Sequence, residues 1–382
     1  MSIRNKILKI VNKPVKNIKS SQTLYEALLT SINLGKIYPC ISYRQSAEKI
    51  ALLIVESQLE DGGFDIGYNF QFGKGMKKKN KKESTSPEIL SLYALIAYYE
   101  MYHDNRVVSA IDKAVEWIVN NSIEVDKNLW AIPYAPCSYR EIHITNATSF
   151  AVAALAYYTK VFQNDIYKPI VNGMLTYMKE QLVLKEDYGY WNYFENELVN
   201  DPGYSKIDNY HIAQQLFYHM KVSEVYSNTD NVFIVEKVSR YLHFLLEESI
   251  KVPYTIVLGK KSQDIHIWGY CSLLSCECLL GEGEKAEALK DFIIEKFWNG
   301  NYFTPVINQD GKVLDNNYYP RSDAWVLHSL SEYIMFKDDK KIKDIVDKGL
   351  ERLQNSQYCG LENHVITLRK KIFTKLVYMI RG

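Results

Sequence analysis

The chain of 382 residues can form one large domain or two ordinary ones, and its 47% apolar and 24% charged residues are typical of globular proteins. Its formal net charge of +1 gives no global field that would favour nucleic acid as a partner, and no run of about 18 apolar residues predicts a membrane span. The 30 tyrosines, beside 14 Phe and 6 Trp, supply amphipathic rings for a core or for a site that stacks on sugars.

Residues 1–20 are predicted to be a basic N-terminal arm. They carry Arg4, Lys6, Lys9, Lys13, Lys16 and Lys19, with no acidic residue and without the apolar core of a secretory signal. A solvated arm is the leading interpretation, and peripheral contact with an anionic membrane surface is the alternative. The six cysteines form no CxxC pair, so we expect reduced thiols and neither a metal nor a cofactor. The expected location of the protein is the cytoplasm, with peripheral attachment to the inner membrane face as an alternative.

Residues 21–357 are predicted to be a single domain of paired helices. The first pair covers about 21–34 and 43–59, and later first members begin near Ser86, Thr145, Ile207, Ile265 and Arg321, about sixty residues apart. These first members are apolar or small nearly all round, as in 86–102, which predicts helices enclosed on both sides. The second members have one apolar stripe, such as Val108, Ile111, Val115 and Ile118, which predicts helices with one solvated face.

The alternation predicts an all-α fold, an (α/α)6 toroid of six helical hairpins with inner and outer rings of helices. An open helical solenoid is the alternative. Strand signals are few, and 253–259 is a short extended piece at best. We expect residues 358–382 to be a C-terminal extension that packs on the toroid.

The links from outer to inner helices are long and rich in aromatic residues and glycine, whereas the inner-to-outer links are short. In an up-down ring all the long links lie at one end, where every inner helix begins, and long loops on a rigid scaffold commonly carry function. The lysine-rich part of the first long link, 74–82, is either a solvated loop or a lid that attracts an anionic ligand.

The inner helices begin with polar residues at this end, which predicts a site there. His211 lies one turn after Asp208, and a histidine can act as general acid or base near neutral pH. A simple helix cap is the alternative for each such aspartate. The candidate catalytic residues are His211, Asp208, Tyr210, Asp264 and Asp323. The candidate substrate-binding residues are Asp61, Phe64, Glu88, Trp130, Tyr139, Arg140, His143, Asn146, Trp191, His266, Trp268, Arg321 and Trp325.

Three patches resemble α/α-toroid proteins of bacterial surface-polysaccharide biosynthesis, which belong to the wider prenyltransferase-like and glycosidase-like toroid superfamily. SQLEDGGFD at 57–65 is similar to the glycine-rich turn of toroid repeats, IDNYHIAQQL at 207–216 to a D-x-x-H helix start, and PRSDAWVLHSLSEYI at 320–334 to an R-x-x-A-W helix. The resemblance implies a carbohydrate-related role and matches Asp208, His211, Arg321 and Trp325. The same turn resembles terpene cyclases and protein prenyltransferases, but the chain has no DxDD or DDxxD motif.

The leading hypothesis is a carbohydrate-active protein that acts on a glycan or an activated, nucleotide- or lipid-linked sugar in surface-polysaccharide metabolism. As an enzyme it would be an epimerase, lyase or hydrolase, and hydrolysis would need two carboxylates about 5–9.5 Å apart. An isoprenoid-handling or terpenoid cyclase-like toroid is the first alternative. A non-catalytic glycan-binding or scaffold protein is the second. The substrate, the reaction and the oligomeric state stay open at this point.

Overall fold

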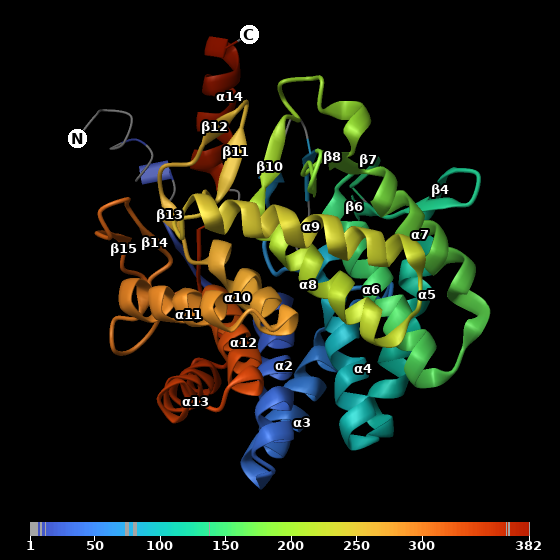
Figure 1. Ribbon diagram of the computed structural model, residues 1–382, viewed down its shortest axis with the longest axis vertical. Coiled ribbons are helices and arrows are strands. Elements are labelled where there is room, and N and C mark those ends of the chain that lie inside the picture. Colours follow the sequence, from blue (N-terminus) through green and yellow to red (C-terminus); the bar gives the residue numbers. More distant parts are fainter. Residues whose placement is uncertain are drawn as a thin grey trace.

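The computed structural model describes the chain except for residues 1–6, 8, 9, 12, 73–75, 79–81, 137, 364, 366 and 382. Six helical hairpins form its body (Figure 1). The first helices of the hairpins are α2 (Ser21–Ile37), α4 (Leu90–Tyr102), α6 (Thr145–Phe162), α8 (Asn209–Val225), α10 (Trp268–Leu280) and α12 (Pro320–Phe336). The second helices are α3 (Ile41–Ser57), α5 (Val108–Asn121), α7 (Lys168–Glu180), α9 (Thr229–Glu248), α11 (Gly283–Phe297) and α13 (Lys340–Asn355).

The first helices pack side by side in chain order, and α12 packs against α2, so they form a closed inner ring. This confirms the predicted (α/α)6 toroid and excludes the open solenoid. The two sequence patterns explain the two layers. In α6 every residue from Thr145 to Thr159 is buried, whereas α13 buries only the stripe that faces α12.

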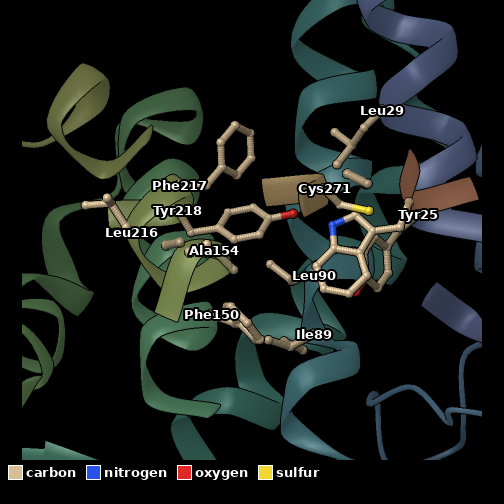
Figure 2. Packing of buried hydrophobic residues seen from close by; sticks show 14 of the residues in the cluster. Tyr25, Leu29, Ile89, Leu90, Phe150, Ala154, Leu216, Phe217, Tyr218 and Cys271 are labelled. Atoms are coloured by element: carbon tan, nitrogen blue, oxygen red, sulfur yellow. The ribbon is translucent and has the colours of Figure 1, made fainter. Parts of the chain in front are cut away.

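Small side chains on the inner helices let large rings fill the centre of the toroid. Figure 2 shows side chains from several inner helices meeting there, with Phe150, Phe217 and Tyr218 packed close together. Tyr218 is buried and its ring centroid lies 5.5 Å from that of Phe150, in an edge-to-face arrangement that aromatic pairs favour. These described residues therefore form a packed core in the middle of the ring.

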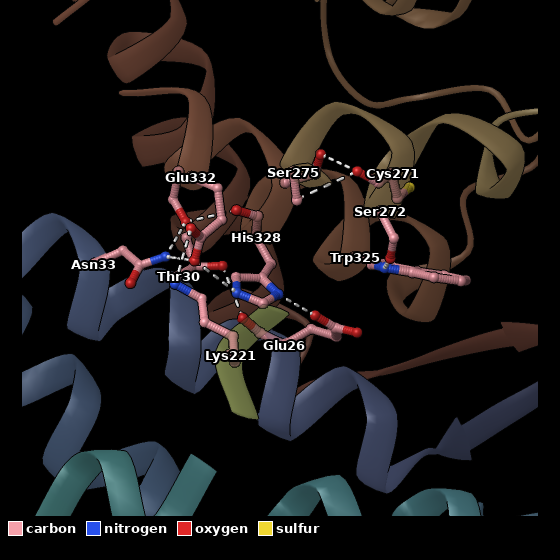
Figure 3. Close-up of polar contacts among 12 residues, drawn as sticks. Glu26, Thr30, Asn33, Lys221, Cys271, Ser272, Ser275, Trp325, His328 and Glu332 are labelled. Atoms are coloured by element: carbon pink, nitrogen blue, oxygen red, sulfur yellow. Dashed lines mark hydrogen bonds and ion pairs between the residues drawn. The ribbon is translucent and has the colours of Figure 1, made fainter. Parts of the chain in front are cut away.

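A polar cluster crosses the seam between the first and last inner helices (Figure 3). His328 of α12 places Nδ1 2.5 Å from Glu26 Oε2 of α2, and Nε2 3.5 Å from Glu332 Oε1. Asn33 donates to Glu332 at 2.8 Å, and Lys221 of α8 lies 4.0 Å from the same carboxylate. Charge-assisted contacts therefore join helices that are about 300 residues apart in the sequence.

The long links contain more regular structure than the sequence predicts. The described residues form short antiparallel sheets from β2 (Gln71–Phe72) and β3 (Met76–Lys77), β4 (Ile123–Asp126) and β5 (Leu129–Ala131), β6 (Pro133–Ala135) and β7 (Tyr139–His143), β8 (Leu182–Leu184) and β9 (Gly189–Trp191), β10 (Lys206–Asp208), β11 (Thr255–Val257) and β12 (Lys260–Lys261), and β13 (Ile265–His266), β14 (Val306–Ile307) and β15 (Val313–Asp315). Strands of two to five residues are too short to show alternation, so the sequence carries little signal for them. The expected extended piece at 253–259 contains β11.

The two ends of the chain meet beside the toroid. β1 (Val15–Lys19) pairs antiparallel with β16 (Cys359–Glu362), and Glu362 is buried. Beyond β16, helix α14 (Leu368–Arg381) lies at the top of the view in Figure 1. None of the helices in the described part of the chain is long and apolar enough to cross a bilayer.

Candidate functional site

A cavity of about 230 Å³ lies at the end of the ring where the inner helices begin. Six of the predicted site residues line it, namely Glu88, Tyr210, His211, Trp268, Arg321 and Trp325. They come from the first two turns of α8, α10 and α12 and from the 3-10 turn Ser86–Ile89 before α4. The inner ring thus brings together residues that are far apart in the sequence, at the end where helix starts and long links meet.

Aromatic rings stack along one wall of the cavity. His211 lies against Tyr193 at 5.5 Å between ring centroids and against Tyr210 at 3.8 Å. The rings of Tyr210 and Tyr254 are nearly parallel, 4.7 Å apart, and His266 stacks on the other side of Tyr254 at 4.2 Å. Such flat faces suit the apolar face of a sugar ring.

His211 carries the acid–base potential of the site. Its Nδ1 lies 3.5 Å from Oδ2 of Asp208, which is buried and also forms an ion pair with Lys206. Burial lowers the pKa of His211 and outweighs Asp208, so the imidazole is neutral at physiological pH and can accept a proton. Burial would raise the pKa of Asp208, but Lys206 and His211 outweigh it and hold that pKa below its usual value.

Arg321 supplies a fixed positive charge. Its guanidinium lies 4.4 Å from the centroid of the Trp268 ring, and its Nε lies 3.0 Å from Glu362 Oε2. Burial opposes the charge, but Glu362 outweighs it and the pKa of Arg321 is raised. The indole of Trp268 is held in turn by donating to Ser322 Oγ at 2.8 Å. A buried, oriented cation of this kind can stabilise negative charge that develops on a ligand oxygen.

Glu88 is a second titratable group in the cavity. It is buried, and its carboxylate accepts a hydrogen bond from the Thr85 hydroxyl. Burial raises the pKa of Glu88 to about 7, against the opposing effects of Thr85 and Arg321. At neutral pH the carboxyl group can therefore either give or take a proton.

Three predicted aspartates lie away from the cavity. Asp323 accepts from Arg352 at 2.7 Å and from the Phe303 amide at 3.1 Å, so it fastens the outer helix α13 and a link to α12. Asp61 accepts from the hydroxyl of Ser84, the indole of Trp117 and the Gly63 amide, and so shapes the glycine-rich turn. Asp264 is exposed on the loop before β13.

The other predicted binding residues that lie outside the cavity lining have mixed surroundings. Phe64 and Trp191 are buried in the scaffold, and Trp191 donates to the carbonyl of Met178 at 2.8 Å. His143 pairs with Glu195 at 2.9 Å. Asn146 is buried, and His266 reaches the cavity wall by stacking on Tyr254. Trp130 and Tyr139 are half-buried, and Arg140 is exposed.

Sequence reasoning missed much of the cavity lining. The missed residues include Gln22, Tyr25, Tyr68, Phe70, Tyr134, Tyr193, Lys206, Gln214 and Tyr254. Gln22 and Tyr25 begin α2, and the rule that inner helices begin at the site would have found them. The tyrosines of the links gave no positional signal, because the links contain many aromatic residues of which only some turn inward.

Only part of the lysine-rich link 74–82 lies within the described residues. Lys74, Lys79 and Lys81 lie outside the described residues, and Lys78 is buried and paired with Asp65 at 2.7 Å. Lys78 therefore has a structural partner. Among the described residues, no three His, Cys, Asp or Glu side chains are grouped as the ligands of a metal ion would be.

Comparisons with known proteins give no matching family model and no matching curated protein. Among solved structures, the chain is similar to cellobiose 2-epimerase from Bacillus thermoamylovorans, with a TM-score of 0.63 and 11% identity over 83% of this chain and 89% of that one. It is similar to a D-mannose isomerase, with a TM-score of 0.63 and 12% identity over 84% and 88%. A GH76 α-mannanase from Bacteroides thetaiotaomicron gives a TM-score of 0.59 and 12% identity over 92% and 96%. The chain therefore has the (α/α)6 toroid fold of these proteins.

Proposed function

We propose that the protein is a carbohydrate-active enzyme that moves a proton at the carbon next to the carbonyl group of a sugar, as in epimerisation or isomerisation. The observation that carries this proposal is the neutral His211 in a cavity that also contains Arg321 and stacked rings. The sugar epimerase and isomerase among the structures of the same fold support it.

The chemistry follows from three side chains. His211 accepts the proton from the carbon, and Asp208 stabilises the imidazolium that forms. Arg321 stabilises the negative charge that develops on the carbonyl oxygen of the sugar. Glu88, with a pKa of about 7, exchanges a proton with the sugar oxygens. The sugar takes up one proton for each one it loses, and the proton held by His211 can exchange with water in between, so no further reactant is needed.

The carboxylates of the cavity argue against hydrolysis. A glycosidase needs two carboxyl groups on either side of the bond. Within the described cavity lining Glu88 supplies one, whereas Asp208 is held by Lys206 and His211. The charged groups of the lining argue equally against an isoprenoid ligand, which prefers an apolar pocket.

The size of the cavity favours a small substrate. About 230 Å³ is below the range of roughly 300–1,000 Å³ found for drug-sized ligands. We therefore propose a ligand of about one sugar ring, or the terminal ring of a longer glycan or lipid-linked sugar. A role in surface-polysaccharide metabolism is part of the proposal and rests on the resemblance of the three sequence patches.

Exchange of hydrogen for deuterium tests the reaction directly. A panel of free aldoses and ketoses is incubated with the protein in D2O, and proton NMR follows the signal next to the carbonyl carbon. We expect exchange with at least one sugar, and His211→Asn should slow it by about 100-fold or more. The control His103→Asn changes an exposed histidine at the left-handed C-cap of α4, where asparagine is well tolerated, and should exchange normally.

Two results would contradict the proposal. One is exchange that His211→Asn leaves unchanged. The other is sugar binding, measured by calorimetry, without exchange of any sugar in the panel, which would support a non-catalytic glycan-binding protein instead.

A further inference from the structure

The C-terminal helix α14 leaves a line of large apolar side chains uncovered. Leu368, Ile372, Leu376 and Met379 are 73%, 51%, 50% and 73% exposed. Their spacings of four, four and three residues place them on one face of the helix. Large apolar residues of the toroid helices are mostly buried, with single exceptions such as Ile41, so a line of four exposed ones on one face of a described helix indicates a partner.

The charged Lys and Arg residues of the segment that carries this face are all positive, with no acidic residue among them. Residues 363–382 contain five basic residues and no acidic one. Arg369, Lys371 and Lys375 are exposed on α14. A helix with an apolar face and lysine or arginine beside it is typical of segments that lie in the interface of an anionic membrane, because long basic side chains reach the phosphates while their stems stay on the apolar boundary.

The other end of the chain adds to the same positive surface. The pairing of β1 with β16 brings the N-terminal segment next to the residues that lead into α14. Lys13, Lys16 and Lys19 are exposed there, and the chain has no acidic residue before Glu26. Both terminal segments therefore present positive charge on one side of the molecule.

This side is also the side of the cavity. Glu362 contacts Arg321 in the cavity lining, and α14 begins at Leu368, six residues later. Six residues span at most about 20 Å, so the first turn of α14 lies within that distance of the cavity wall.

We propose that α14 lies in the surface of an anionic phospholipid membrane, with its apolar face at the boundary of headgroups and acyl chains and its basic residues on the phosphates. The basic N-terminal segment lies on the same surface, and the end of the toroid that carries the cavity faces the membrane. This proposal concerns binding alone and stands whether or not the cavity catalyses a sugar reaction.

Sedimentation with lipid vesicles tests the proposal on the full chain. Vesicles of phosphatidylcholine with added phosphatidylglycerol should bind the protein, vesicles of phosphatidylcholine alone should bind it at least about tenfold less, and salt should weaken the binding. The double variant Ile372→Glu/Leu376→Glu should reduce the partition coefficient by about tenfold or more. The matched control Ile41→Glu/Ile166→Glu changes two exposed isoleucines on the outer ring side and should bind as the unchanged protein does.

The outcomes separate the alternatives. Circular dichroism should show the same thermal midpoint for all three proteins, since the changed residues are exposed. Equal binding to neutral and anionic vesicles, or full binding by the α14 variant, would overturn the proposal. A dimer in light scattering that the α14 variant dissociates would also overturn it, because a second copy of the chain would then cover the apolar face.

Discussion

Replacing His328 with glutamine tests whether the buried ion cluster stabilises the closed ring. His328 lies between Glu26 of α2 and Glu332 of α12, at 2.5 Å and 3.5 Å. Burial alone would lower the pKa of His328, but the two carboxylates outweigh it and raise the pKa to about 9. Glu332 has a pKa of about 2 and is the firmer partner, whereas burial raises the pKa of Glu26.

The magnitude and its sign follow from linkage. A histidine whose pKa rises from 6.5 in the unfolded chain to about 9 in the folded chain contributes about 3 kcal/mol to the free energy of unfolding. That contribution is fully present below pH 6.5 and is lost as the pH rises through 9. Glutamine keeps hydrogen bonds to the carboxylates but cannot be protonated, so the variant lacks this dependence.

Urea unfolding at several pH values measures the effect. At pH 6 the unchanged protein should exceed His328→Gln in stability by about 3 kcal/mol more than it does at pH 9.5. His219→Gln is the control: burial lowers the pKa of His219 to about 4, so only the unfolded chain protonates this residue near pH 6, and the difference from the unchanged protein should shift by less than about 1 kcal/mol and in the opposite sense. A constant difference for His328→Gln would refute the idea that a charged histidine stabilises the seam.

Three further changes probe the cavity. Burial of Glu88 destabilises its ionised carboxylate, so the stability of the protein falls as the pH rises from 4.5 to about 7. In urea unfolding, Glu88→Gln should therefore gain about 3 kcal/mol relative to the unchanged protein between pH 4 and pH 8, whereas the control Glu351→Gln, on the exposed face of α13, should not. Asp208→Asn removes a charge that raises the pKa of His211, so the midpoint of its NMR titration should move to lower pH by about one unit, and an unchanged midpoint would show that the pair is not coupled. Glu362→Gln leaves the buried guanidinium of Arg321 without its counter-charge and should lower the free energy of unfolding by about 3 kcal/mol, measured by calorimetry. An unchanged free energy of unfolding would show that solvent reaches the guanidinium.

The fold could be predicted because the repeat expresses a physical requirement. Helices such as α6 are enclosed on both sides and must be apolar or small throughout, whereas α13 has water on one side. A sixty-residue period of these two patterns predicts paired helices in two layers and favours a ring, and the contact of α12 with α2 decides for the ring against an open solenoid. The short strands escaped prediction because two to five residues are too few to show alternation, and in a pair such as β13 with β14 the partner also lies about forty residues away.

Part of the cavity lining was predicted for a similar reason. His211 and Arg321 were found because polar residues at inner-helix starts must gather at one end of a ring. Asp323 has the same position in its helix, yet it turns toward Arg352 of α13, and a sequence does not show which way such a side chain turns. Glu362 was out of reach, because only the folded chain brings the C-terminal strand to Arg321.

The meeting of α2 with α12 also bears on how the protein is made. The first inner helix leaves the ribosome long before its neighbour on the far side has been synthesised, so one flank of α2 stays uncovered for most of translation. The ring can close only after the last hairpin has been synthesised. A nascent chain that ends before Pro320 exposes the apolar flank of α2 and is prone to aggregation or to capture by chaperones.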